Sequence, residues 1–296
     1  MIQTAFNGLC MAIADSVPGV SGGTIAFILG FYDRFIEALH DLFGESRENR
    51  KSAFVYLFKL GVGWAPGMGL CALLLSNLFT KYIYFMSSLF LGLTVASIPF
   101  IIIAEKGSLQ GKLQNFPFAI AGVVLVITLS LLRNSAGAFG NINFLHLQLV
   151  QFVYIFLAGM VAITAMVLPG ISGSTVLLIA GVYLPTISAV KELLHFNFME
   201  LPGLFALGLG ILFGIRVSIG FIRTARKKYC SQTMYLIIGL MIGSLFAIVM
   251  GPTTLSTPVP ALDVSTFHIW GFVAGVGVLL GLEYLKEKIS GQEAHH

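Results

Sequence analysis

Two short polar runs interrupt an otherwise apolar chain, and their residue types suit the binding of an anion. Each run has the pattern Pro-Gly-X-Ser-Gly, at residues 18–22 and again at residues 169–173. Proline removes a backbone donor and glycine relaxes the backbone, so we expect a helix to break at each run and a new helix to start after it. The first turn of a helix offers unpaired N–H groups and the positive end of the dipole, and serine and threonine hydroxyls add donors. This is the chemistry of a phosphate cradle.

Both helix starts are therefore predicted to bind the anion. The candidate anion-binding residues are Ser21, Gly22, Gly23, Thr24, Ser172, Gly173, Ser174 and Thr175. The candidate helix-breaking residues are Pro18, Gly19, Pro169 and Gly170. Small residues at these positions could instead serve only close helix packing in lipid. The repetition of the whole run favours the cradle over packing alone.

Charged residues inside apolar segments are costly there and are functional candidates for that reason. Asp15 lies three residues before Pro18, and the matching position of the second run is Met166. An acid on one side of a duplicated site is what proton or sodium coupling needs, whereas capping of the hairpin or pairing with a base is the alternative. Arg216 is a candidate for bidentate phosphate binding, unless its side chain simply extends to the membrane interface.

Three further charged residues form a second tier of candidates, namely Arg34, Glu37 and Lys59. Arg34 and Glu37 are three residues apart on one helix face, where they can pair with each other. Lys59 lies close enough to the end of its apolar segment for its ammonium group to reach the interface.

The first run also matches the Gly-X-Ser-X-Gly pattern of serine nucleophiles, at residues 19–23. Such a serine needs a base, usually histidine, within hydrogen-bond reach. The internal histidines fall at the ends of apolar segments or in loops; they are His40, His146, His195 and His268. Catalysis also does not require a duplicated motif, so an enzyme is disfavoured. No metal-ligand or disulfide spacing joins the histidines or the three cysteines, and we expect no cofactor and no metal.

The composition places both runs in a membrane. Hydrophobic residues make up 57% of the 296 residues and charged residues 10%, with a mean hydropathy of +0.92. A soluble domain carries about 25% charged residues, so this chain has too little polar surface for a water-soluble globule. The 33 glycines suit close helix packing in lipid. The fold class predicted is an all-α polytopic membrane protein.

A membrane-spanning helix needs about 20 apolar residues. The predicted spans are 54–79, 83–104, 116–133, 201–222, 232–250 and 267–285. Two further apolar blocks, about 3–40 and 149–190, are too long for one helix and contain the two polar runs in their middle. We interpret each block as a broken-helix hairpin that enters and leaves on the same side.

The two halves of the chain resemble each other. Under a shift of 151 residues, identical residues coincide at Gly19/Gly170, Ser21/Ser172, Gly22/Gly173, Thr24/Thr175, Gly30/Gly181 and Tyr32/Tyr183. Under a shift of 147, they coincide at Leu60/Leu207, Gly61/Gly208, Gly63/Gly210, Tyr82/Tyr229, Gly92/Gly239, Leu93/Leu240 and Ser97/Ser244. This indicates an internal duplication, with a first repeat at 1–133, a connecting loop at 134–148 and a second repeat at 149–288.

Topology follows from the basic residues, because Lys and Arg collect in cytoplasmic loops. With re-entrant hairpins, the basic loops 41–53, 105–115 and 223–231 share one side with the C-terminal Lys286 and Lys288. The opposite side then carries only Lys81, Arg133 and Lys191. Both termini are predicted to be cytoplasmic in a bacterial inner membrane. One hairpin and three spans per half give the halves opposite orientations, which is the inverted repeat of many secondary transporters. Blocks that span once would instead give parallel repeats.

The segments ADSVPGVSGGTIAFILGFYDRFI at 14–36 and LPGISGSTVLLIAGVY at 168–183 resemble the signature of a bacterial membrane family. That family, long a domain of unknown function, is associated with undecaprenyl-phosphate translocation and called PopT. The resemblance covers essentially the whole chain. It implies a flippase that returns the C55 polyprenyl-phosphate carrier of cell-wall synthesis to the cytoplasmic leaflet, by alternating access around a phosphate site at the midplane. Met166 in place of an acid confines any coupling role to the first half.

The implied partners are the polyprenyl-phosphate lipid, the bilayer and a coupling ion, H⁺ or Na⁺, and no nucleic acid. A small-anion channel or transporter would use the same cradle without a lipid-facing slot and is the alternative function. The coupling ion and the oligomeric state, a homodimer included, do not follow from the sequence.

Overall fold

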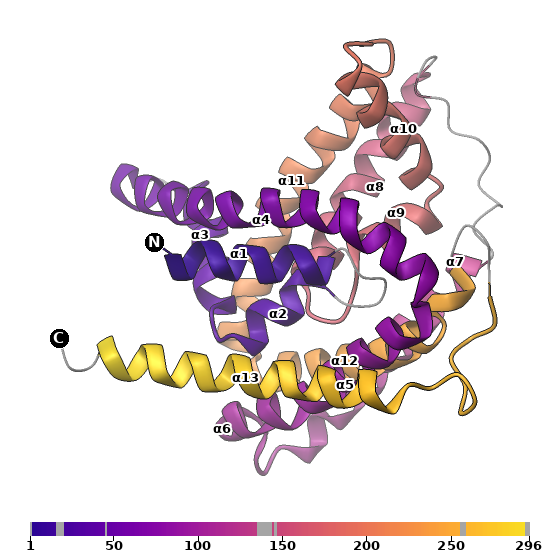
Figure 1. The fold of residues 1–296 in the computed structure, drawn as a ribbon. Helices are drawn as coiled ribbons and strands as arrows, with labels where there is room; N and C mark the ends of the chain where they lie inside the picture. The colour runs from indigo at the N-terminus through magenta and orange to yellow at the C-terminus, as the bar shows by residue number, and fades with distance from the viewer. Residues whose placement is uncertain are drawn as a thin grey trace.

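The structure, a computed structural model, describes residues 2–15, 21–44, 46–134, 144, 147–254 and 259–293, and these parts are helical with no strand. Figure 1 shows the helices packed together as a bundle. The first half contains α1 (Ile2–Asp15), α2 (Gly22–Ile28), α3 (Tyr32–Asp41), α4 (Arg47–Lys81), α5 (Ile83–Ala104), α6 (Lys106–Leu109), η1 (Leu113–Asn115) and α7 (Phe116–Asn134). The second half contains α8 (Leu149–Val167), α9 (Gly173–Ile179), α10 (Tyr183–Leu194), α11 (Leu201–Lys228), α12 (Cys230–Val249), η2 (Gly251–Thr254) and α13 (Ile269–Glu293).

Within the described residues, six helical segments are long and apolar enough to cross a membrane. They are Arg47–Leu70, Ile83–Ala104, Leu113–Leu132, Leu149–Val167, Leu201–Lys228 and Cys230–Val249, and α13 adds a shorter apolar stretch at Ile269–Gly281. The prediction of a polytopic helical membrane protein is therefore confirmed. Helix ends extend past several predicted spans. For example, α11 continues to Lys228 because basic side chains suit the negative end of a helix.

Each interrupted block is a helix, a break, a seven-residue helix and a further helix. The first block gives α1, α2 and α3, and the second gives α8, α9 and α10. In both blocks the short helix packs against the helix before the break, α2 against α1 and α9 against α8. In the second block α8 alone has the length and apolarity of a membrane span.

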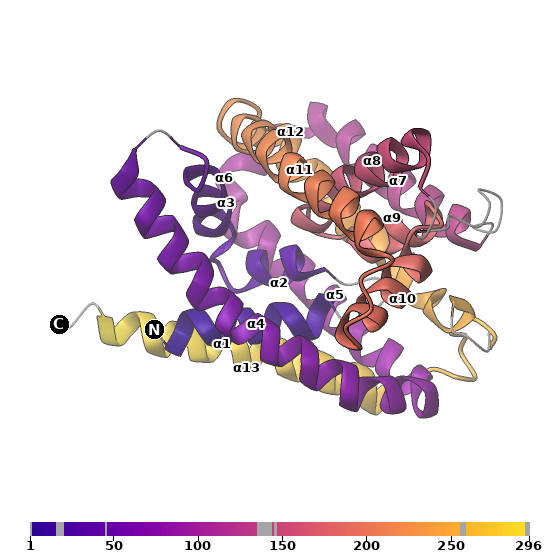
Figure 2. The ribbon, with the colours of Figure 1, turned by 90° about the horizontal axis from the view of Figure 1, so that it is seen from above.

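Helix packing repeats between the two halves. α1 packs along α4 just as α8 packs along α11. The second long helix of each half pairs with the third of the other half, so α5 packs on α13 and α12 packs on α7. Figure 2 shows α1 running alongside α4. The halves are thus interlocked and neither forms a separate domain.

Equivalent glycines hold equivalent helix pairs together. A Cβ at position 63 would lie 1.7 Å from the carbonyl oxygen of Ala5, and a Cβ at position 210 would lie 2.1 Å from that of Phe156. Gly63 and Gly210 are related by the shift of 147, and Ala5 and Phe156 by the shift of 151. Only glycine permits backbones to approach this closely.

Equivalent glycines also lie where the second long helix of one half packs on the third long helix of the other. Gly92 faces the carbonyl of Phe272, and Gly239 faces that of Ala119. Phe272 and Ala119 are 153 residues apart, a correspondence that the sequence comparison missed. Because the loops before these helices differ in length between the halves, α7 and α13 align under a shift of 153 rather than 147.

The centre of the bundle is α12. Met234, Ile237, Leu240 and Met241 on this helix are at most 1% exposed. Ala14 and Ile25, which flank the first polar run, belong to the same apolar cluster as α5 and α12. The core therefore fixes the ends of α1 and α2, where the functional candidates lie.

Candidate functional site

The first polar run joins the end of α1 to the start of α2. Ser21 is the N-cap of α2 in an extended conformation, and its Oγ accepts a hydrogen bond from the Thr24 N–H at 3.3 Å. Serine favours this position because its side chain satisfies an N–H group that the helix leaves unpaired. The predicted breakers Pro18 and Gly19 lie outside the described residues.

Asp15 places its carboxylate at the start of α2. Its Oδ1 accepts from the Gly22 N–H at 2.7 Å, and its Oδ2 accepts from the indole Nε1–H of Trp64 at 3.0 Å. A Cβ at position 22 would lie 2.8 Å from Asp15 Oδ2, so glycine is needed for this approach. The positive end of α2 thus holds a carboxylate of the protein itself, which is the capping role considered for Asp15.

The second polar run lacks such a carboxylate. Gly170 has φ +90, and Ser172 is the N-cap of α9 without a side-chain bond to the helix. The Ser172 Oγ lies 2.7 Å from the Oγ of Ser174, which is exposed. Among the described hydrogen bonds, none involves the N–H groups of Gly173 or Ser174. The start of α9 therefore has N–H groups available for a ligand, whereas at the start of α2 the Gly22 N–H is already bonded to Asp15.

The two runs meet. Thr24 Oγ1 accepts from the Gly170 N–H at 2.9 Å, and Ser21 Oγ donates to the Leu168 carbonyl at 3.4 Å. Ser21 and Thr24 are 1% and 2% exposed. A Cβ at position 23 would lie 2.8 Å from the carbonyl oxygen of Val167. The two hydroxyls of the first cradle thus bond the break of the second run, at Leu168 and Gly170.

The remaining charged candidates lie elsewhere. Arg216 is exposed on α11 and lines a separate cavity of about 220 Å³ with Leu39, His40 and other residues at the end of α3. The structure does not bring it to the two runs, because its face of α11 turns toward that end of α3. Arg34 stacks on the Tyr56 ring at 4.7 Å rather than pairing with the exposed Glu37. Lys59 lines a different cavity from Arg216.

Serine nucleophile chemistry finds little support in the contacts of the first run. The hydrogen-bond partners of Ser21 are Thr24 and the Leu168 carbonyl. The partners of the His40 ring are Arg223 and Asp41, and the backbone N–H of His268 donates to the Ser88 Oγ. Within the described residues there is also no group of three His, Cys, Asp or Glu side chains placed to hold a metal.

Comparison with known families gives a match over residues 11–264 to the VCA0040-like family, which is described as undecaprenyl phosphate translocase-like. The chain belongs to this family. The resemblance seen in the two polar runs is therefore confirmed. The match includes both runs and the helices that place them.

Two relatives are similar to this family member over most of their length. A polyprenyl-phosphate transporter of Staphylococcus aureus is 35% identical over 248 residues, covering 84% of this chain and 86% of its own. A polyprenyl-phosphate transporter of Vibrio cholerae is 31% identical over 254 residues, covering 82% of this chain and 76% of its own. No solved structure matches the chain.

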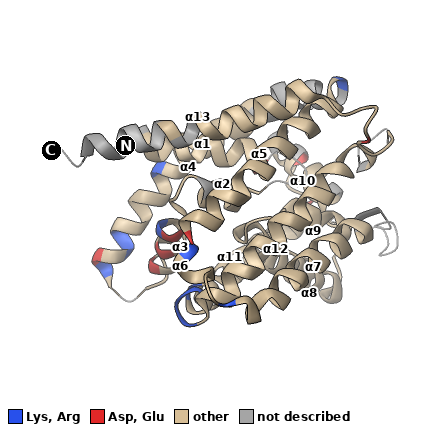
Figure 3. Cartoon of the chain, turned by 90° about the horizontal axis from the view of Figure 1, so that it is seen from below, with Lys and Arg blue, Asp and Glu red and all other residues tan. Residues whose placement is uncertain are grey.

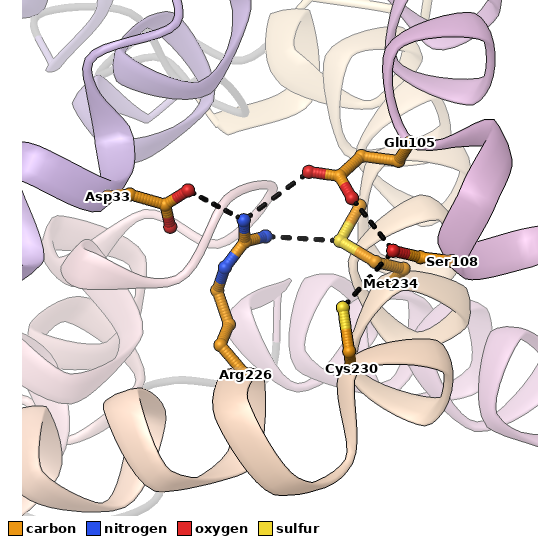
Figure 4. A network of polar contacts seen from close by, with 6 residues as sticks. All are labelled: Asp33, Glu105, Ser108, Arg226, Cys230 and Met234. Carbon is orange, nitrogen blue, oxygen red and sulfur yellow. Dashed lines mark hydrogen bonds and ion pairs between the residues drawn. The ribbon is translucent and has the colours of Figure 1, made fainter.

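Two residues with contacts at or near the site were not identified as candidates from the sequence. Trp64 donates a hydrogen bond to Asp15, which is 49 positions earlier in the sequence. The one feature of the sequence that could have pointed to Trp64 is that the chain has only two tryptophans. Arg226, counted above only as part of a basic loop, joins the two halves (Figure 4). Its Nη2 donates to Asp33 Oδ2 at 2.8 Å and to Glu105 Oε1 at 3.3 Å. We call Arg226, Asp33 and Glu105 the Arg226 network.

The Arg226 network contributes to stability mainly through Glu105. The Glu105 side chain is 22% exposed and the Asp33 side chain 67% exposed, so water screens the Asp33 pair more. We expect Arg226→Met to lower the free energy of unfolding by about 1–3 kcal/mol, because a partly buried carboxylate loses a charged donor. Thermal unfolding of the purified protein measures this loss.

The control for Arg226→Met is Lys227→Met, which removes a charge from the exposed neighbouring residue. Double-mutant cycles with Glu105→Gln and Asp33→Asn assign the interaction energy to each pair. A coupling to Asp33 as large as that to Glu105 would contradict this account.

Proposed function

We propose that the chain moves a polyprenyl phosphate, the C55 undecaprenyl phosphate, across the bacterial inner membrane. The observation that carries this proposal is the meeting of the two polar runs, where Thr24 accepts from the Gly170 N–H. It brings the hydroxyls at the start of α2 to the break that precedes α9, and hydroxyls and helix starts suit a phosphate group. Membership of the family and the names of the two relatives supply the lipid class.

In the proposed mechanism the phosphate replaces contacts that the protein makes with itself. The free N–H groups of Gly173 and Ser174, with the hydroxyls of Ser172, Ser174 and Thr175, would bind it first. The bond from Gly170 to Thr24 and the bond from Gly22 to Asp15 would then give way to the phosphate oxygens. The prenyl tail would stay in lipid throughout, because burying it in protein is unnecessary when the bilayer already dissolves it.

The proposed topology is an inverted repeat with re-entrant hairpins and both termini in the cytoplasm. Three long helices follow each hairpin, α4, α5 and α7 in one half and α11, α12 and α13 in the other. Figure 3 shows charged residues gathered at the end of the bundle formed by the start of α4, α3 and the α11–α12 turn. The first turn of α1 and the last turn of α13 lie on one side of the molecule in Figure 1. This agrees with the cytoplasmic excess of Lys and Arg.

Alternating access would arise from movement of one repeat against the other around the two runs. The Arg226 network joins the repeats at the charged end, so its opening would expose the site toward the proposed cytoplasmic side. Net movement toward the cytoplasmic leaflet would return the carrier for reuse. Proton or sodium binding at Asp15 would drive it, because a neutralised carboxylate releases the Gly22 N–H.

Reconstitution into liposomes tests the function. We expect the wild type to exchange undecaprenyl phosphate between leaflets, and Ser172→Ala with Ser174→Ala to slow the exchange about a hundredfold, because two donors to a charged group are lost. Neither hydroxyl caps α9, so folding should survive. Leaflet exchange is followed by accessibility of the lipid to an added phosphatase.

The matched control is Ser97→Ala, which removes a buried hydroxyl that donates only to the Thr94 carbonyl of its own helix. It should exchange lipid at the wild-type rate. A folded wild type that passes phosphate or chloride but exchanges no lipid would contradict the lipid substrate and favour a small-anion transporter.

A further inference from the structure

A second cavity, with basic walls, lies between α1, α3 and the first turns of α4. Its volume is about 360 Å³, and none of its lining residues belongs to the two runs. The lining residues are Thr4, Arg34, Glu48, Lys51, Ser52, Val55, Tyr56 and Lys59. Each water molecule occupies about 30 Å³ in the liquid, so a phosphate group with part of its hydration shell fits.

The cavity has an excess of positive charge. Arg34, Lys51 and Lys59 face a single acid, Glu48. Among the described ion pairs, none involves any of these four side chains within 4.0 Å. Basic side chains that line a cavity without an ion-pair partner suit an anion such as a phosphate monoester, which carries a charge of about −1.5 to −2 at pH 7.

Tyr56 gives independent evidence for a ligand in this cavity, because its hydroxyl has no hydrogen-bond acceptor or donor beside it among the described residues. The residue is 7% exposed, and its hydroxyl is buried with no hydrogen-bond partner. Most buried hydroxyls are hydrogen-bonded, and an unmet one lowers stability. The ring of Tyr56 also carries the Arg34 guanidinium on its face, so an anion that bound Arg34 would come close to this hydroxyl.

The basic lining of this cavity belongs to the first half and is not repeated in the sequence of the second. The positions equivalent to Arg34, Lys59 and Tyr56 in the second half hold Pro185, Ala206 and Gly203. A duplicated cradle treats the two sides of a membrane alike, whereas a site built in one repeat does not. The cavity is lined by α1, α3 and the start of α4, and the last two belong to the end of the bundle where charged residues gather in Figure 3.

An apolar surface adjoins the basic walls. Val55, Phe58 and Val62 on α4 are 41%, 63% and 50% exposed and follow one another along one side of the helix. A phosphate held by Lys59 would leave an attached hydrocarbon chain free to lie along these side chains. This neighbourhood suits an amphiphilic phosphate better than a free inorganic one.

We propose that this cavity is a second anion site, which holds the phosphate group of a polyprenyl phosphate on one side of the membrane only. It rests on the proposed function for the identity of the lipid. Arg34, Lys51 and Lys59 bind the phosphate oxygens, the Tyr56 hydroxyl donates to one of them, and the prenyl chain lies along the exposed face of α4. The site collects or releases the lipid that the two polar runs carry.

Binding to the full-length protein in detergent tests the proposal with two probes, undecaprenyl phosphate and inorganic phosphate. We expect Arg34→Gln with Lys59→Gln to weaken the apparent affinity for undecaprenyl phosphate about tenfold or more, because two charged donors are lost. Lys106→Gln with Lys112→Gln removes the same charge from exposed residues outside the cavity. That control should change the affinity less than about twofold.

Tyr56→Phe separates binding from folding. The change should weaken undecaprenyl phosphate binding, while the unfolding temperature of the ligand-free protein stays the same or rises, since an unmet hydroxyl is removed. A fall in the unfolding temperature with unchanged binding would overturn the role of Tyr56. Inorganic phosphate that binds as tightly as the lipid, with the same dependence on Arg34 and Lys59, would overturn the lipid as the occupant.

The two proposals fail differently. If the cavity variants bind lipid as the control does while the Ser172 and Ser174 variant loses leaflet exchange, the cavity proposal falls and the proposed function stands. If the wild type exchanges no lipid but its anion binding still depends on Arg34 and Lys59, the proposed function falls and the cavity remains an anion site.

Discussion

Asp15→Ala is expected to abolish leaflet exchange and to lower the free energy of unfolding by about 2–5 kcal/mol. The substitution leaves the Gly22 N–H and the Trp64 indole N–H without their acceptor. Ala14 and Ile25, on either side of the first run, pack in the apolar core, so these donors cannot easily find another partner. Two unmet donors at membrane depth account for this loss. Thermal unfolding and liposome exchange measure the two effects separately.

Asp15→Asn isolates the charge from the hydrogen bonds. The amide oxygen still accepts one of the two bonds but never ionises, so we expect a folded protein whose exchange rate no longer responds to an imposed proton or sodium gradient. Glu37→Gln removes an acid from an exposed position on α3 and should keep the response. A gradient response that survives Asp15→Asn would exclude Asp15 as the coupling group.

Gly63→Ala is expected to separate α1 from α4 and to lower the free energy of unfolding by about 3 kcal/mol or more. The new Cβ would lie 1.7 Å from the carbonyl oxygen of Ala5, and a backbone atom cannot move aside as a side chain can. Loss of this contact would also displace Trp64, the next residue, from Asp15. Size-exclusion profiles and thermal unfolding of the purified variant measure the damage.

The chain contains matched controls for this substitution. Gly61→Ala adds a Cβ with no atom within 4 Å, so its stability should stay within about 1 kcal/mol of the wild type and gain from helix propensity. Gly210→Ala and Gly208→Ala repeat the comparison in the second half, where a Cβ would lie 2.1 Å from Phe156 O and in open space respectively. Equal tolerance at Gly63 and Gly61 would contradict the close α1–α4 packing.

Features set by local sequence were predictable. The long helices follow from runs of apolar residues, and the breaks follow from Pro-Gly before a serine N-cap. Ser21 and Ser172 do begin the short helices α2 and α9. The meeting of the two runs followed only from their duplication, since nothing in either run alone specifies its partner.

Features set by contacts distant in sequence were not predictable. Arg226 and Asp33 are 193 positions apart, and a basic loop gives no sign of which acid its arginine will meet. The pairing of α5 with α13 and of α12 with α7 crosses the repeat boundary, and the duplication in the sequence does not specify it. For Arg216 the sequence left phosphate binding and extension to the interface open, and the residue is exposed on α11, away from the two runs.

The built-in carboxylate distinguishes the two halves of the candidate site. In the first half Asp15 occupies the helix start that an incoming phosphate would use, and in the second half Met166 leaves the equivalent position without an acid. A phosphate that binds α9 therefore needs no displacement, whereas one that reaches α2 competes with Asp15. Under the proposed function, this difference would give the duplicated site a direction-dependent step and would link substrate binding to the charge of Asp15.

The most direct test of the central claim is a cryo-electron microscopy structure of the full-length protein in nanodiscs with undecaprenyl phosphate. The account predicts phosphate density between Ser21–Thr24 and Ser172–Thr175, with the bond from Gly170 to Thr24 broken and the prenyl chain running into lipid. Phosphate density found only elsewhere on the protein, with the two runs still bonded to each other, would contradict it.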